Sequence, residues 1–153
     1  MKSLILKLVI PLTVLFFFVF TKWWYVLPVD APRTMMYGFP LVWISKGWHT
    51  SMSFQIFWKE FLINLLFYFT CILALVYVVN KFIYKIKLHR LLNILLMLIC
   101  FIIGLSAFAI GTMTENIYYF ERDFEVEILD SGYKFVWDDV GPLRENNEQI
   151  QKE

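Results

Sequence analysis

Apolar residues gather in three long stretches of the chain, over residues 3–20, 61–79 and 91–113. The second and third stretches contain no charged residue. The first contains only Lys7, which lies near its start and can extend its amine toward water. A helix needs about 20 apolar residues to cross the hydrocarbon core of a bilayer. The pattern therefore predicts three transmembrane helices.

The first stretch also resembles a signal peptide, because a basic start precedes its apolar core. However, the core continues into Thr-Lys-Trp-Trp-Tyr, and the nearest small-residue site, over residues 29–31, lies well beyond it. We therefore expect residues 1–20 to form an uncleaved anchor helix.

Basic residues cluster in the short connector over residues 80–90. They are Lys81, Lys85, Lys87 and Arg90. Since Lys and Arg are held on the cytoplasmic side, this connector is expected to be cytoplasmic. Three spans then place the N-terminus in the cytoplasm, with loop 21–60 and tail 114–153 outside. Loop 21–60 carries four basic residues of its own, which makes the charge bias moderate.

Tryptophan and tyrosine residues flank the apolar stretches on the side expected to be outside. They are Trp23, Trp24, Tyr25, Trp58, Tyr118 and Tyr119. Such rings prefer the interface between hydrocarbon and water. We therefore expect these six residues to form an aromatic belt.

The tail over residues 114–153 is polar, with eleven acidic and four basic residues and a net charge of −7. Within it, apolar and polar residues alternate on both sides of Ser131 and Gly132. This alternation predicts a β-hairpin over residues 124–137, with Ile128 opposite Phe135. An isolated hairpin is marginally stable in water, so loop 21–60 is expected to cover its apolar face.

Loop 21–60 contains five of the six tryptophans and mixes turn-forming residues with large apolar ones. This composition predicts a compact segment lying on the bilayer surface. Its residues 47–51, GWHTS, place His49 beside Trp48 and next to an expected helix start. We interpret His49 as a polar anchor at the membrane interface.

The alternative is a ligand-binding or catalytic site at the outer interface, with Glu60 or Asp30 nearby. Its candidate ligand-binding residues are His49, Trp48, Trp43 and Tyr37. A single histidine without a second His or Cys nearby is a poor metal site. No spacing in this loop arranges a nucleophile, a base and an orienting group. The sequence therefore predicts no catalytic residue, no metal and no cofactor.

The second and third apolar stretches contain no ionisable residue, whereas pumps and ion carriers depend on such groups inside the membrane. A transporter built from this chain alone is not expected. Within the third stretch, Gly104, Ala107 and Gly111 line one side of a helix, and small residues let helices approach closely. This stripe predicts packing against the other helices of the chain or against a partner protein.

Composition supports a membrane protein, because hydrophobic residues make up 59% of the chain and the mean hydropathy is +0.62. A net charge of +1 without a basic patch gives no indication of nucleic-acid binding. The abundance of Lys, Asn, Ile and Phe is typical of an inner-membrane protein from a low-GC bacterium.

We therefore expect an all-α, multi-pass protein of the bacterial inner membrane. Three transmembrane helices would carry a small extracytoplasmic cap that contains the C-terminal hairpin. We expect a non-enzymatic accessory, scaffold or immunity-type subunit that docks onto another envelope protein. Its expected partners are the lipid bilayer and another membrane protein or a second copy of the chain.

Overall fold

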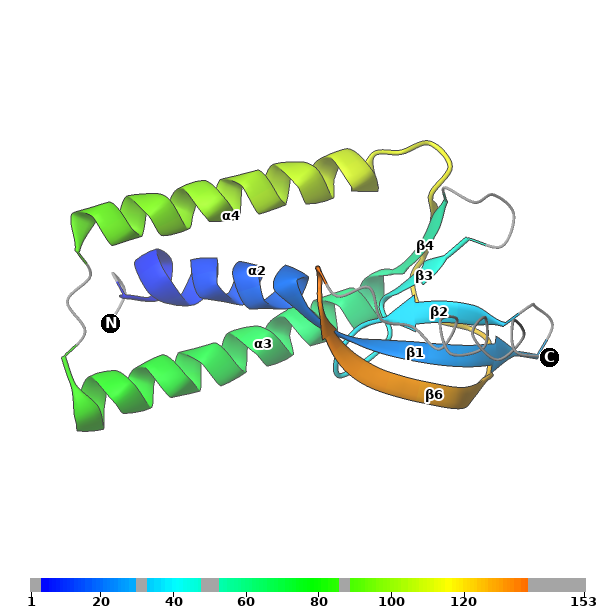
Figure 1. Cartoon of the computed structure of the whole chain (residues 1–153), viewed down its shortest axis with the longest axis horizontal. Helices are drawn as coiled ribbons and strands as arrows, with labels where there is room; N and C mark the ends of the chain where they lie inside the picture. Colours follow the sequence, from blue (N-terminus) through cyan, green and yellow to red (C-terminus); the bar gives the residue numbers. More distant parts are fainter. Residues whose placement is uncertain (1–3, 30–32, 48–52, 86–88, 138–153) are drawn as a thin grey trace, which may run out of the picture. The chain divides into compact units, whose positions relative to one another are not determined.

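The structure is a computed structural model (Figure 1), and it describes residues 4–29, 33–47, 53–85 and 89–137. The chain divides into two compact units. The helical unit contains residues 1–19 and 63–113, and the sheet unit contains residues 20–62 and 114–153. Each unit is therefore assembled from segments that are far apart in the sequence.

The helical unit is made of long apolar helices. Their bounds are η1 (Ile5–Val9), α2 (Ile10–Val19), α3 (Trp58–Val78), η2 (Val79–Ile83) and α4 (Arg90–Gly111), where η marks a π-helical turn. Both η1 and α2 pack against α4. Phe17 of α2 lies edge-on to Tyr68 of α3, with ring centroids 5.7 Å apart. The N-terminal helix therefore contacts both of the longer helices.

The prediction of three transmembrane helices is wrong. Among the described residues, two helices are long and apolar enough to cross a membrane: 26 residues over Trp58–Ile83 and 22 residues over Arg90–Gly111. The N-terminal helix has five π-helical and ten α-helical residues, a length of about 22 Å, while a bilayer core is about 30 Å thick. It ends at Val19 because the following residues form a strand.

The described residues of the sheet unit form six strands, so the prediction of an all-α protein is also wrong. The strands are β1 (Phe20–Pro28), β2 (Thr34–Tyr37), β3 (Ile44–Lys46), β4 (Phe54–Phe57), β5 (Ile117–Tyr119) and β6 (Val126–Phe135). Their order is β5-β4-β3-β2-β1-β6, with only β4 and β5 paired in parallel. Four of these strands, β1 to β4, lie in the segment that the sequence predicted to be a compact loop on the bilayer surface.

The predicted hairpin over residues 124–137 does not form. Instead β6 runs without a turn and pairs antiparallel with β1, which places Trp23 opposite Gly132 and Trp24 opposite Ser131. A Cβ atom added at Gly132 would lie 2.8 Å from Cζ2 of Trp23. Gly132 therefore makes room for an indole rather than for a turn, and a register shift beside Tyr25 and Val26 lets the long strands twist together.

Both faces of the sheet carry a small apolar core. One core is formed by Val26, Met36, Val42 and Phe57, with Trp24, Phe124 and Val126 packed around it. The other is formed by Trp23, Tyr25 and Met35, with Tyr37 beside it. Because successive residues of a strand point to opposite faces, β1 contributes to both cores.

Candidate membrane-interface site

Helix α4 has an apolar surface that the described residues leave largely uncovered. Leu91, Phe101 and Phe108 are each about 70% exposed, and no residue of α4 is fully buried. The half-buried residues form one stripe, made of Asn93, Leu96, Ile99, Cys100, Ile103, Ala107 and Gly111. These positions recur every three or four residues, as expected for the side of a helix that packs against its neighbour. The rest of the surface suits lipid.

Both long helices join the same edge of the sheet. β4 ends at Phe57 and α3 begins at Trp58, with no linker between them, while β5 follows α4 after a short connection. β4 and β5 pair in parallel, which sets Gln55 opposite Ile117 and Phe57 opposite Tyr119. The start of α3 and the chain leaving α4 are therefore held together by backbone hydrogen bonds.

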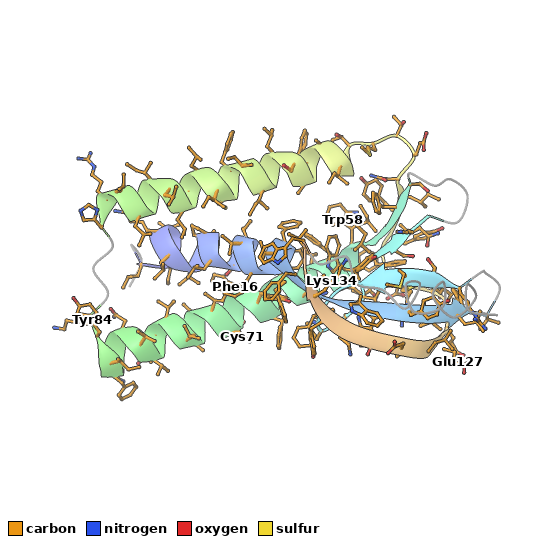
Figure 2. The ribbon with its side chains drawn as sticks, in the orientation of Figure 1. Phe16, Trp58, Cys71, Tyr84, Glu127 and Lys134 are labelled. Carbon is orange, nitrogen blue, oxygen red and sulfur yellow. The ribbon has the colours of Figure 1, made fainter. Side chains whose placement is uncertain are left out.

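Aromatic rings gather at this edge and form what we call the β5-edge cluster, made of Trp43, Trp58, Phe61 and Tyr118. The rings of Trp58 and Tyr118 stack at 6.1 Å. Phe61 lies edge-on to both Trp58, at 5.6 Å, and Trp43, at 5.2 Å. Trp58 and Tyr118 are more than 40% exposed, and Figure 2 labels Trp58 at the start of α3. Such half-exposed rings are typical of a membrane–water interface.

Polar contacts hold the segment after β5 against the first turn of α3. Lys59 N donates to Phe120 O at 2.9 Å, and its side chain forms an ion pair with Glu121. Arg122 N donates to Glu60 Oε1 at 3.3 Å. Glu60 lies in the first turn of α3, where a negative charge interacts favourably with the helix dipole. Its other oxygen, Oε2, is buried and accepts no hydrogen bond within the described part of the chain.

Tyr37 and Trp43 lie on either side of a tight turn between β2 and β3. Trp43 N donates to Tyr37 O at 3.0 Å. The turn requires Gly38, whose φ is +145° and where an added Cβ would lie 2.1 Å from Leu41 O. The two side chains do not converge, because Tyr37 packs beside Trp23 while the Trp43 ring contacts Phe61.

Tyr37 lies in an apolar environment that also holds a cation. The Lys134 Nζ atom lies 4.7 Å from the centre of the Tyr37 ring. Burial raises the pKa of the Tyr37 phenol above its ordinary value of 10.0. His49 and Trp48, the other predicted ligand-binding residues, lie outside the described residues, as does Asp30. The described part of that predicted site is thus a structural turn.

The small-residue stripe of α4 is only partly used by the chain itself. Ala107 and Gly111 are half-buried, whereas Gly104 is exposed, and a Cβ atom added there would meet nothing within 4 Å. Close packing against the chain's other helices therefore does not explain Gly104.

The expected aromatic belt divides into two groups. Trp23 and Tyr25 are buried in the sheet, and Trp24 Nε1 donates to Gly38 O at 2.9 Å, so these three residues belong to the sheet core. The belt prediction placed them wrongly, because residues that follow an apolar stretch can equally begin a strand. Trp58, Tyr118 and Tyr119 are exposed. Phe61 and Phe120 were not among the predicted residues, because in the sequence they look like ordinary apolar residues.

Among the described residues, no group of three or more His, Cys, Asp or Glu side chains is arranged to hold a metal ion. No family model, curated protein or solved structure matches the chain. The β5-edge cluster and the uncovered surface of α4 are therefore the features from which a function can be argued.

Proposed function

We propose that this protein is a non-enzymatic accessory subunit of the bacterial inner membrane, in which α3 and α4 cross the bilayer and the sheet unit lies at the outer surface. In this role it docks onto another envelope protein. The observation that carries the proposal is the parallel pairing of β4 with β5, which holds together the strand entering α3 and the strand following α4.

A pair of helices that leaves a sheet and returns to the same edge has a simple topology. If both helices cross a bilayer, the sheet lies on one side and the connector over residues 80–90 on the other. The connector carries four basic residues, which favours the cytoplasmic side for it and the outer side for the sheet. The exposed rings of Trp58, Tyr118 and Tyr119 then lie where aromatic residues favour the interface.

The exposed surface of α4 supports docking as well as anchoring. Lipid accommodates large side chains such as Leu98 and Phe101 without any special contact. Gly104 instead leaves a shallow site on the helix surface, and close helix approach at small residues is a common way for membrane helices to associate. We therefore assign the partner's helix to the Gly104 side of α4.

The topology is tested by cysteine labelling in intact cells. In a Cys71→Ser, Cys100→Ser background, single cysteines replace Glu125 in the sheet unit and Lys85 in the connector. A membrane-impermeant maleimide is expected to label the Glu125 site at once and the Lys85 site only after the membrane is opened. Labelling of both sites in intact cells, or the reverse pattern, would overturn the proposed arrangement.

Docking is tested by purifying the tagged protein in a gentle detergent and identifying co-purified proteins by mass spectrometry. We expect a stoichiometric membrane partner that is lost in Gly104→Leu. Ala109→Leu adds the same side chain elsewhere on α4 and should retain the partner. If the protein purifies alone with a bound lipid or small molecule, the accessory role is wrong, and the alternative site around His49 gains support.

A further inference from the structure

The outer edge of the sheet carries a row of aromatic side chains, which we call the edge ladder. It consists of Phe20, Tyr133, Phe135 and Trp137. Phe20 stacks on Tyr133 at 5.6 Å with an interplanar angle of 7°, and Phe135 stacks on Trp137 at 5.1 Å with an angle of 5°. Phe20 also contacts Phe135 at 5.6 Å, which joins the two stacks. The ladder is therefore one continuous surface.

Three of the four ladder rings are exposed, and Phe20 is half-buried. The exposed fractions are 57% for Tyr133, 43% for Phe135 and 68% for Trp137. β6 is the last strand of the sheet, so no described strand lies beyond it. A contiguous apolar patch of this kind marks a surface that contacts lipid or another molecule.

Chain connectivity places the ladder at the end of an apolar helix. Phe20, the first residue of β1, directly follows Val19, the last residue of α2. Phe20 pairs with Phe135 in the sheet, so the ladder lies within a few residues of that helix end. If the helical unit is embedded in the bilayer, the ladder begins at the depth where the chain leaves it.

The charged residues of β6 are distributed so that its acidic end is the one farther along β1 from α2. Glu125 directly precedes β6 and Glu127 is its second residue, and both line a shallow pocket together with Pro28 and Val29. Figure 2 shows Glu127 and Lys134 toward opposite ends of the strand. The acidic end pairs with the part of β1 that is farthest along the chain from α2, since Glu127 is opposite Leu27. Carboxylates are favoured in water, whereas the aromatic end of the strand is favoured at the membrane–water interface.

A lysine accompanies the aromatic end on the same face of the sheet. Lys22 is opposite Tyr133 in the strand register, and its Nζ atom lies 3.6 Å from the Trp24 ring centre and 5.8 Å from that of Tyr133. A cation beside exposed aromatic rings complements the phosphate groups of phospholipids, because the rings enter the acyl boundary while the amine stays among the headgroups.

We propose that the edge ladder inserts into the headgroup layer of the membrane, so that phospholipid is the ligand of the β1–β6 edge and Lys22 lies among lipid phosphates. This inference rests on the proposed function, since it needs the helical unit in the bilayer. It adds a second lipid contact, on the opposite edge of the sheet from the β5-edge cluster.

The test measures depth with nitroxide labels on the full-length protein in phosphatidylcholine–phosphatidylglycerol vesicles. In the Cys71→Ser, Cys100→Ser background, single cysteines replace Val136, Glu127 and Phe101. Val136 is 64% exposed and lies between two ladder residues, so labelling it leaves the ladder intact. Collision rates with oxygen and with a water-soluble nickel chelate then report immersion at each site.

We expect the Val136 label to lie between the other two, with several-fold less nickel contact than the Glu127 label and less oxygen contact than the Phe101 label. A Trp137→Ser, Tyr133→Ser double variant should raise nickel contact at Val136 toward the Glu127 value, while Glu125→Ser should not change it. Far-UV circular dichroism checks that each variant is folded.

Two other results would overturn the inference in different ways. If the Phe101 label is in lipid but the Val136 label is as accessible to nickel as the Glu127 label, the ladder lies in water and the anchoring by α4 still stands. If the Phe101 label is itself accessible to nickel, the membrane anchor fails and the lipid contact of the ladder fails with it.

Discussion

Phe57 and Phe101 are the same residue type in two different surroundings. Phe57 is fully buried in the sheet unit and contacts the rings of Tyr119 and Phe124, whereas Phe101 is 71% exposed on α4. In the sheet unit, apolar side chains cover one another and exclude water. On α4 most of the large apolar side chains are exposed. In the proposed arrangement, packing stabilises the sheet unit and lipid covers the exposed surface of α4.

The largest expected difference is in the free energy of unfolding, when Phe57 and Phe101 are each replaced by alanine. Phe57→Ala leaves a cavity between two rings and should lower the free energy of unfolding by about 3–5 kcal/mol. Phe101→Ala, the matched control, should have a much smaller effect because lipid chains fill the space. Unfolding of protein in detergent micelles, followed by tryptophan fluorescence, measures both. Equal losses would contradict the assignment of the α4 surface to lipid.

An added positive charge should be harmful on α4 and harmless on the sheet, the reverse of the effect of removing a phenylalanine. Leu98→Lys places an ammonium near the middle of α4, which costs about 2.5–3.5 kcal/mol of membrane insertion. Leu129→Lys adds the same charge to β6, where Leu129 is 41% exposed, and insertion should be unchanged. Membrane insertion is measured as the fraction of each variant that remains in the membranes after carbonate extraction. Full retention of Leu98→Lys would argue that α4 does not span the bilayer.

Two glycines provide a smaller and more local comparison. Gly132→Ala pushes a methyl group against the buried Trp23 indole and should cost about 1–3 kcal/mol of stability through overpacking. Gly104→Ala adds the same methyl group in open space, and the gain in helix propensity should leave stability unchanged or slightly raised. Thermal melting in micelles compares the two variants. A similar drop in melting temperature for both would mean that Gly104 is packed against another chain.

The smallest effect concerns Tyr37. Its pKa is raised by burial, so above pH 10 the unfolded chain loses this proton while the folded chain keeps it. Stability should therefore fall as the pH rises from the unfolded pKa of 10.0 toward the higher folded value, and should be insensitive to this group below that window. In Tyr37→Phe this part of the decline should disappear. An unchanged pH profile in that variant would show that Tyr37 ionises freely in the folded state.

The long helices were predictable because hydropathy is a local property. The apolar stretches over residues 61–79 and 91–113 coincide with α3 and α4, since a helix forms its backbone hydrogen bonds within itself. Hydropathy gave a wrong prediction for the first apolar stretch, over residues 3–20. Its hydropathy continues through Phe20, but the helix ends at Val19 because Phe20 pairs with Phe135.

The sheet could not be predicted in the same way, because its pairings join distant segments. β1 pairs with β6, about a hundred residues later, and β4 pairs with β5 across both long helices. Local alternation around Gly132 suggested that residues 124–137 pair with themselves. The partner that lies across from them is β1, whose Trp23 needs the space that Gly132 leaves.

The sequence by itself determined which segments are apolar enough to avoid water, where positive charge lies between the long helices, and which ring residues surround the helix ends. Only the tertiary structure decided which of those rings are buried, as for Trp23, and which remain exposed, as for Trp58. The physical reason is that transfer of a side chain out of water depends on its own composition, whereas burial depends on neighbours that distant strand pairing supplies.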